Sequence, residues 1–122
     1  MKKINFIQDC GIYDYQFNVY VGFTQDEMIK NLVRYKKVDN LIKEIKKADF
    51  KSGGFVLYDE ESKRIVWLPK WTRKWQELSN LAHEIHHIVF LLAKQKGFED
   101  EIESQAYLFQ YLLDNVYKKL NG

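Results

Sequence analysis

The sequence predicts a single α+β domain in which a small antiparallel sheet packs on a layer of helices. Three observations support this prediction. The 122 residues suit one domain rather than two. Aromatic and β-branched residues alternate with polar ones near the N-terminus, and helical periodicity covers most of the second half of the chain. We therefore expect residues 1–122 to fold as one unit, without linkers or repeats.

The N-terminal half predicts one strand followed by two helices. Residues 12–23 alternate large apolar side chains with polar or smaller ones, which is the pattern of a strand. Thr24 followed by Glu27 has the spacing of a capping box, so we expect a helix to begin there and to run to about residue 35. A second helix is expected over about 38–48, where apolar residues recur at helical spacing and lysines occupy the other face.

The second half predicts a hairpin followed by two helices. The short apolar runs at 55–58 and 64–68 have the composition of strands, and the polar residues between them suit a hairpin loop. Helical periodicity begins at about Thr72, and a last helix over about 100–120 follows a break at Gly97. The order of strand, helices, hairpin and helices is typical of the α+β class.

Charge and cysteine content exclude several classes of protein. The chain has 19 basic and 17 acidic residues and a formal net charge of +2, which gives no electrostatic case for a nucleic-acid binder. The single cysteine, Cys10, cannot form an intrachain disulfide, so a secreted disulfide scaffold is excluded. Residues 88–93, the longest apolar run, are far fewer than the roughly twenty that a membrane span needs. With no signal peptide recognised, we expect a cytoplasmic protein.

Three tryptophans spaced four residues apart offer a different interpretation. Trp67, Trp71 and Trp75 alternate with basic residues, and such a surface could stack on single-stranded nucleic acid. The near-neutral charge of the chain favours the simpler interpretation, in which these residues anchor a strand end and a helix start on the core.

All three histidines of the chain lie within five residues, in the run Leu81-Ala82-His83-Glu84-Ile85-His86-His87-Ile88. On a helix, residues four apart face the same way, so His83 and His87 could chelate one divalent ion. Zinc is the default for nitrogen and carboxylate ligands in tetrahedral geometry, which makes Zn²⁺ the expected cofactor. Glu84 lies about 60° from His87 around the helix, where it could reach a metal-bound water as a general base.

The surroundings of the motif predict that the two imidazoles are buried. Phe90 and Leu91 flank their side of the helix, and the opposite side carries an apolar stripe of Leu78, Ala82, Ile85, Val89 and Leu92. A helix that is apolar on two sides is expected between two layers, where buried imidazoles need partners such as a metal. The alternative is a solvent-exposed face that contains histidines by chance. We expect His86 at a partly exposed polar edge.

A catalytic zinc site needs a third protein ligand and an open fourth position. No histidine remains elsewhere, so the third ligand must be a carboxylate or Cys10. Our candidate is Glu103, which borders the apolar stripe of the last helix beside the small Ala106. The alternative places Glu103 with its acidic neighbours in a solvated first turn of that helix. For Cys10 we expect a small buried apolar residue rather than a ligand.

These residues resemble the gluzincins, zinc peptidases in which two histidines of one helix and a glutamate of the next bind the metal. His83-Glu84-x-x-His87 followed by Glu103-x-x-Ala106-Tyr107 is similar to small metallopeptidases encoded by phages and prophages, and the match covers roughly the second half of the chain. The resemblance implies a zincin-like fold and zinc bound by His83, His87 and Glu103. It also implies that Glu84 activates a zinc-bound water to hydrolyse a peptide or protein substrate.

The resemblance also implies that an exposed edge strand of the hairpin binds the extended peptide. Residues 64–68 are the candidate for that strand, with an ordinary internal strand as the alternative. The tetrahedral oxyanion needs a further hydrogen-bond donor, for which Tyr107, Tyr111 and His86 are candidates. A second functional hypothesis is a non-catalytic, zinc-containing protein of phage type that binds a host or phage partner. A site closed by four protein ligands would favour that hypothesis.

Overall fold

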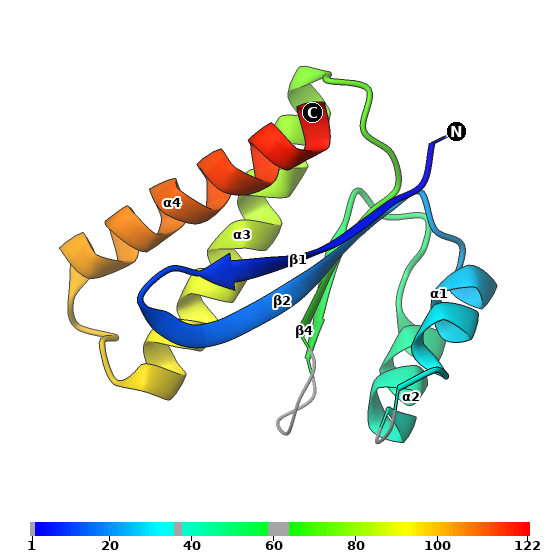
Figure 1. Cartoon of the computed structure of the whole chain (residues 1–122), viewed down its shortest axis with the longest axis horizontal. Helices are drawn as coiled ribbons and strands as arrows, with labels where there is room; N and C mark the ends of the chain where they lie inside the picture. The colour runs from blue at the N-terminus through cyan, green and yellow to red at the C-terminus, as the bar shows by residue number, and fades with distance from the viewer. Residues whose placement is uncertain (1, 36–37, 59–63) are drawn as a thin grey trace.

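The computed structural model describes residues 2–35, 38–58 and 64–122 and confirms the α+β class. A four-stranded sheet lies between two pairs of helices (Figure 1), with α3 and α4 on one face and α1 and α2 on the other. In chain order the elements are β1 (Ile4–Cys10), β2 (Tyr13–Val21), α1 (Gln25–Leu32), α2 (Asp39–Lys47), β3 (Phe55–Tyr58), β4 (Arg64–Leu68), α3 (Trp75–Lys96) and α4 (Ile102–Asn121). The loop expected at 59–63 lies outside the described residues. Within the described ranges, no helix combines the length and apolar character needed to cross a membrane.

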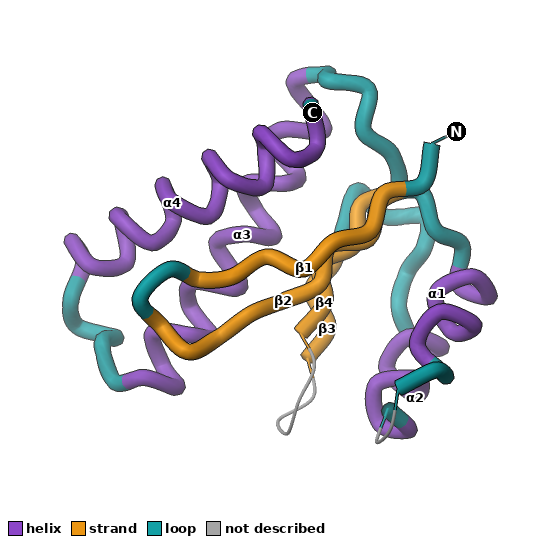
Figure 2. The backbone as a smooth tube through the Cα atoms, in the orientation of Figure 1, coloured by secondary structure: helices purple, strands orange, loops and turns teal. Residues whose placement is uncertain are grey.

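The sheet is mixed, so the prediction of a purely antiparallel sheet is wrong. Its strand order is β1-β2-β4-β3, and the strands lie together between the helix pairs (Figure 2). β1 pairs antiparallel with β2, and β3 pairs antiparallel with β4, but β2 and β4 are parallel. A parallel pair needs a long crossover connection, and here the crossover contains α1, α2 and β3. Because β4 has a partner on each side, β3 rather than 64–68 is the edge strand of the hairpin.

β1 is the strand that the sequence analysis missed. Ile4 and Phe6 pack against the main hydrophobic cluster, and Cys10 is part of it with 1% exposure. α4 lies against this strand, where the Lys119 ammonium donates a hydrogen bond to Gln8 Oε1 at 2.9 Å. Cys10 is thus the small buried residue that the sequence predicted, and its burial raises the pKa of the thiol to about 12.

The central strands place alternate side chains in two separate hydrophobic clusters. In β4, Val66 and Leu68 face α3 and α4, whereas Ile65 and Trp67 face α1 and α2. Trp67 is 2% exposed and stacks on Phe55 with ring centroids 4.7 Å apart. This burial supports the core interpretation of Trp67, since its ring cannot stack on a nucleic-acid base. For Trp75 at the start of α3 the same interpretation is wrong, because its side chain is 79% exposed.

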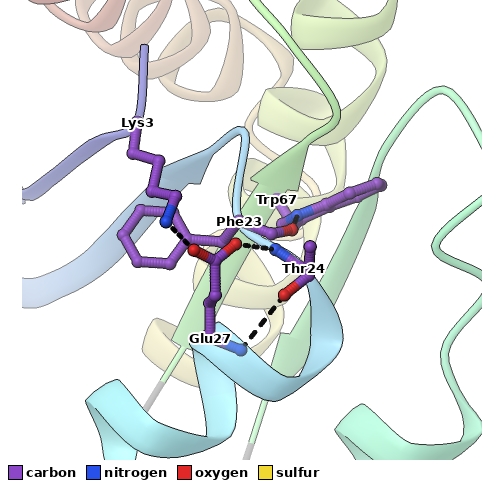
Figure 3. Close-up of polar contacts among 5 residues, drawn as sticks. All are labelled: Lys3, Phe23, Thr24, Glu27 and Trp67. Atoms are coloured by element: carbon purple, nitrogen blue, oxygen red, sulfur yellow. Dashed lines mark hydrogen bonds and ion pairs between the residues drawn. The ribbon is translucent and has the colours of Figure 1, made fainter. Parts of the chain in front are cut away.

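The first helix begins at the capping box predicted from Thr24 and Glu27. The Glu27 N–H donates to Thr24 Oγ1 at 3.2 Å, and the Thr24 N–H donates to Glu27 Oε1 at 2.9 Å. The other oxygen of the Glu27 carboxylate forms an ion pair with Lys3, and the adjacent Phe23 carbonyl accepts a hydrogen bond from Trp67 Nε1 (Figure 3). These contacts connect the start of α1 to the residue before β1 and to β4.

Candidate metal centre

α3 carries the whole histidine motif, and its ends are defined by local interactions. At its start, the buried Glu77 carboxylate accepts hydrogen bonds from Thr72 and from the backbone N–H of Lys74. Gly97 ends the helix in the left-handed conformation, with φ of 80°, as the break in the sequence predicted. The rotation of the helix is set by the side chains that it buries in the main cluster, which include Leu81, Ile85, Ile88, Val89 and Leu92.

His83 and His87 project from the same side of α3, with their Nε2 atoms 3.1 Å apart. Two nitrogens bound to one tetrahedral ion at about 2.0–2.1 Å, the bond length of zinc, lie about 3.3–3.4 Å apart. The rings are therefore close to chelating spacing before any ion binds, and in the metal-free protein one ring nitrogen can donate to the other. Partial burial, with the charges of His83 and His86, lowers the pKa of His87 and favours its neutral, metal-binding form.

Glu84 lies on the inner side of the same turn and is 5% exposed. Burial raises the pKa of its carboxyl, and the nearby His83 opposes that rise. The ligand atoms of His83, Glu84 and His87 all lie within 4.8 Å of one another, so this group could hold a metal ion. A buried carboxyl with a raised pKa also takes up and releases a proton closer to neutral pH than an exposed one.

The edge strand β3 forms the opposite wall of the site. A cavity of about 380 Å³ separates it from α3 and is lined by Gly54, Phe55, Val56, Tyr58, His83, Glu84, His87, Phe90 and Leu91. Gly54 lies close to both α3 and β4. A Cβ atom at this position would lie 3.0 Å from Glu84 Oε2 and 3.1 Å from the Trp67 carbonyl oxygen. The φ of Gly54, 157°, is also rare for residues with a side chain. Gly54 therefore makes room for the Glu84 carboxylate beneath the two imidazoles.

The expectation that the two imidazoles are buried is wrong. His83 and His87 are exposed, and Phe90 beside them is 54% exposed. The other helices pack elsewhere: α4 contacts α3 and β1, whereas α1 and α2 cover the opposite face of the sheet. The histidine side of α3 is therefore open to solvent next to the edge of the sheet, and a bound ion would be accessible to a water or substrate.

Glu103, the predicted third ligand, does not join this group. It is exposed in the first turn of α4, where Gln105 donates hydrogen bonds to the carbonyl oxygens of Phe98 and Glu99. The buried residue of this part of α4 is Leu108, which packs in the main cluster. Because α4 follows α3 after a short turn, its first turn lies near the C-terminal end of α3, beyond the level of His87. The observed position is the solvated first turn of the helix, which is the alternative stated in the sequence analysis.

Two of the three candidate oxyanion donors also lie away from the site. Tyr111 donates to Asp9 Oδ1 at 2.8 Å, and with Tyr107 it lines a separate cavity beside Cys10. His86 is exposed and does not belong to the metal-binding group. The phenol that lines the metal cavity is Tyr58, which the sequence analysis missed. Strand alternation could have identified it, because Tyr58 is two residues from Val56 and shares its face.

Comparisons with protein-family models, curated proteins and solved structures give no significant match. The chemistry of this site is therefore inferred from its own residues.

Replacing Gly54 by alanine is expected to lower the free energy of unfolding by about 3 kcal/mol, because the new Cβ combines backbone strain with contacts to the Glu84 carboxylate and the Trp67 carbonyl. Urea denaturation followed by circular dichroism measures the change. Gly97→Ala is the matched control: its φ is also positive, at 80°, but no atom lies within 4 Å of the new Cβ, so the loss should stay near 1–2 kcal/mol. Equal losses in the two variants would contradict the close approach at Gly54.

Proposed function

We propose that this chain is a zinc-dependent metallopeptidase in which His83 and His87 are two of the metal ligands and Glu84 is the general base. Among the described residues, no third protein ligand besides Glu84 joins this group. The observation that supports the proposal most is the geometry of the motif: two exposed imidazoles with Nε2 atoms 3.1 Å apart, above a buried carboxylate in an open cavity. A donor set of imidazole nitrogen and carboxylate oxygen suits zinc. The resemblance of the His-Glu-x-x-His sequence to gluzincins agrees with this assignment.

Each residue of the group has a distinct part in the proposed reaction. Bound zinc would supply Lewis-acid activation of a peptide carbonyl and of the attacking water. Glu84 takes the proton of that water and returns it to the leaving amine, and the raised pKa of its carboxyl favours holding the proton between these steps. Tyr58, on the opposite wall of the cavity, offers an O–H donor for the oxyanion.

A peptide is the substrate that the position of β3 favours. β3 pairs with β4 along one side and is the last strand of the described sheet on the other. Its free edge can form backbone hydrogen bonds with an extended peptide irrespective of sequence, and it lies directly beside Glu84 and the histidines. The edge-strand role that the resemblance implied for residues 64–68 is thus proposed for Phe55–Tyr58.

The second candidate is a non-catalytic, zinc-containing protein that binds a partner. A structural zinc site is closed by four protein ligands, whereas the described residues bring together two exposed imidazoles and the carboxylate that the proposal assigns as the base. The open site and the buried Glu84 therefore favour the peptidase, and zinc binding without hydrolysis would favour the binding protein. For either function we propose a cytoplasmic location, because a reducing compartment suits one free, buried cysteine.

His83→Ala is expected to weaken zinc binding by at least about 100-fold, because losing a direct ligand costs more than the 10- to 100-fold typical of an outer-shell partner. Competition with a chromophoric chelator measures the affinity. His86→Ala and Glu103→Ala are the controls and should stay within about threefold of the unchanged protein, since neither belongs to the group. A loss in Glu103→Ala as large as that in His83→Ala would show that α4 supplies the third ligand when metal binds.

Glu84→Gln is expected to keep its zinc and to lose peptide hydrolysis by about 10²- to 10⁴-fold, the usual contribution of a general base. The measurement compares zinc content and turnover of a quenched fluorescent peptide library for the zinc-loaded proteins. His86→Ala should retain activity, because its ring is exposed and outside the metal-binding group. Full activity in Glu84→Gln would remove Glu84 from the mechanism.

A further inference from the structure

A second cavity lies beside α3, nearer the start of the helix than the metal cavity. It has a volume of about 190 Å³ and is lined by Gly53, Lys70, Lys74, Gln76 and Asn80, among others. Gly53 directly precedes Gly54, which lines the metal cavity, and Asn80 lies one helical turn before Glu84. The two cavities therefore follow one another along the same side of α3, the first bordered by β3 and the second by Leu68–Lys70 at the end of β4, with Gly53 close to Asn80 between them. We refer to the two cavities together as the groove.

One end of this groove is apolar. Beyond His87, its walls are formed by Tyr58 from β3 and by Phe90 and Leu91 from α3. Tyr58 is 51% exposed and Phe90 is 54% exposed, so both rings offer apolar surface to a ligand. Exposed aromatic side chains that line a concave site are a favourable environment for an apolar side chain of a bound peptide.

The other end of the groove is cationic. Lys70 and Lys74 are both exposed there, and Gln76 donates to Asn80 at 3.1 Å on the helix side. The one carboxylate in this cavity, Glu77, is buried and already accepts hydrogen bonds from Thr72 and Lys74 at the start of α3. That carboxylate interacts electrostatically with Lys70. Both ammonium groups remain exposed, so an acidic ligand can also contact them.

We propose that the groove selects peptides with an apolar side chain next to the scissile bond and an acidic side chain on the other side of that bond. This inference rests on the proposed function, because it places the scissile bond at Glu84. Phe90 lies three helix positions after His87, about 5 Å along the axis, or one to two residues of an extended peptide. Lys74 lies ten positions before Glu84, about 15 Å away. Allowing for the reach of the lysine side chain, the acidic residue belongs about three to four residues from the cleaved bond.

The test measures peptide binding separately from hydrolysis. Zinc-loaded Glu84→Gln protein is titrated into fluorescein-labelled decapeptides that carry Phe and Glu about four positions apart, and fluorescence anisotropy gives the affinity. Changing the peptide Glu to Gln should weaken binding about three- to tenfold, as expected for contacts with exposed cations, and about 0.5 M NaCl should reduce the difference. Changing the peptide Phe to Ser should weaken binding about tenfold.

Variants of the protein assign the preference to the groove. Adding Lys74→Gln or Lys70→Gln to the Glu84→Gln protein should reduce the discrimination between the Glu and Gln peptides. Lys43→Gln is the matched control, because Lys43 is exposed on α2 at the opposite face of the sheet, and it should leave the discrimination unchanged. Equal binding of the Glu and Gln peptides, or discrimination that survives both groove variants, would overturn the inference.

Cleavage by the unchanged protein separates this inference from the proposed function. Hydrolysis of the Phe/Glu peptide next to Phe, with slower hydrolysis of the Gln peptide, supports both. Equal hydrolysis of the two peptides supports the peptidase and overturns the acidic preference. Lysine-dependent binding without any hydrolysis supports the recognition groove and overturns the proposed reaction.

Discussion

The burial of the Glu84 carboxylate against the backbone of Gly54 is the constraint on which the rest of the site depends. Leu81, Ile85 and Ile88 set the rotation of α3 on the sheet, and that rotation turns Glu84 inward. A buried carboxylate destabilises the fold unless it is neutralised or paired. Because Gly54 has no side chain, it leaves the space that the Glu84 carboxylate occupies. With Glu84 inside, the helical spacing places His83 and His87 together at the exposed rim.

The topology of the sheet explains why this rim is accessible. The parallel pairing of β2 with β4 leaves β3 as the edge strand, so one short strand both lines the cavity and presents a free backbone edge. α4 packs against β1 at the other edge of the sheet and does not cover the histidines. The proposed metal, base and peptide-binding edge therefore converge in one open groove, although they belong to separate parts of the chain.

Local signals made much of the fold predictable from the sequence. Three short sequence signals each determine a local element. They are the capping box of Thr24 and Glu27 at the start of α1, Gly97 at the end of α3 and the apolar run 55–58 that forms β3. The clustering of His83, Glu84 and His87 was equally local, because four-residue spacing on a helix suffices to bring two rings together. The general position of the candidate site followed from this motif alone.

The sequence-based predictions that the structure contradicts concern properties that depend on packing between distant segments. The parallel pairing of β2 with β4 and the edge position of β3 depend on the crossover, which no local pattern encodes. The exposure of His83 was mispredicted because Phe90 and Leu91 suggested a covering layer, whereas Phe90 is itself largely exposed. Helix periodicity places Glu103 at the border of the apolar stripe of α4, but the short turn after Gly97 leaves it in the exposed first turn of that helix, away from His87. Tyr58 was missed because its role depends on which strand forms the edge.

X-ray absorption at the zinc edge of the zinc-loaded protein is the most direct test of the proposed metal centre. We expect two imidazole nitrogens at about 2.0–2.1 Å together with oxygen ligands, and no sulfur. His83→Ala should lower the number of imidazole ligands, since the two rings already lie 3.1 Å apart. A sulfur ligand at about 2.3 Å, or a chain that retains no zinc, would contradict the account and leave the two rings joined by an ordinary hydrogen bond.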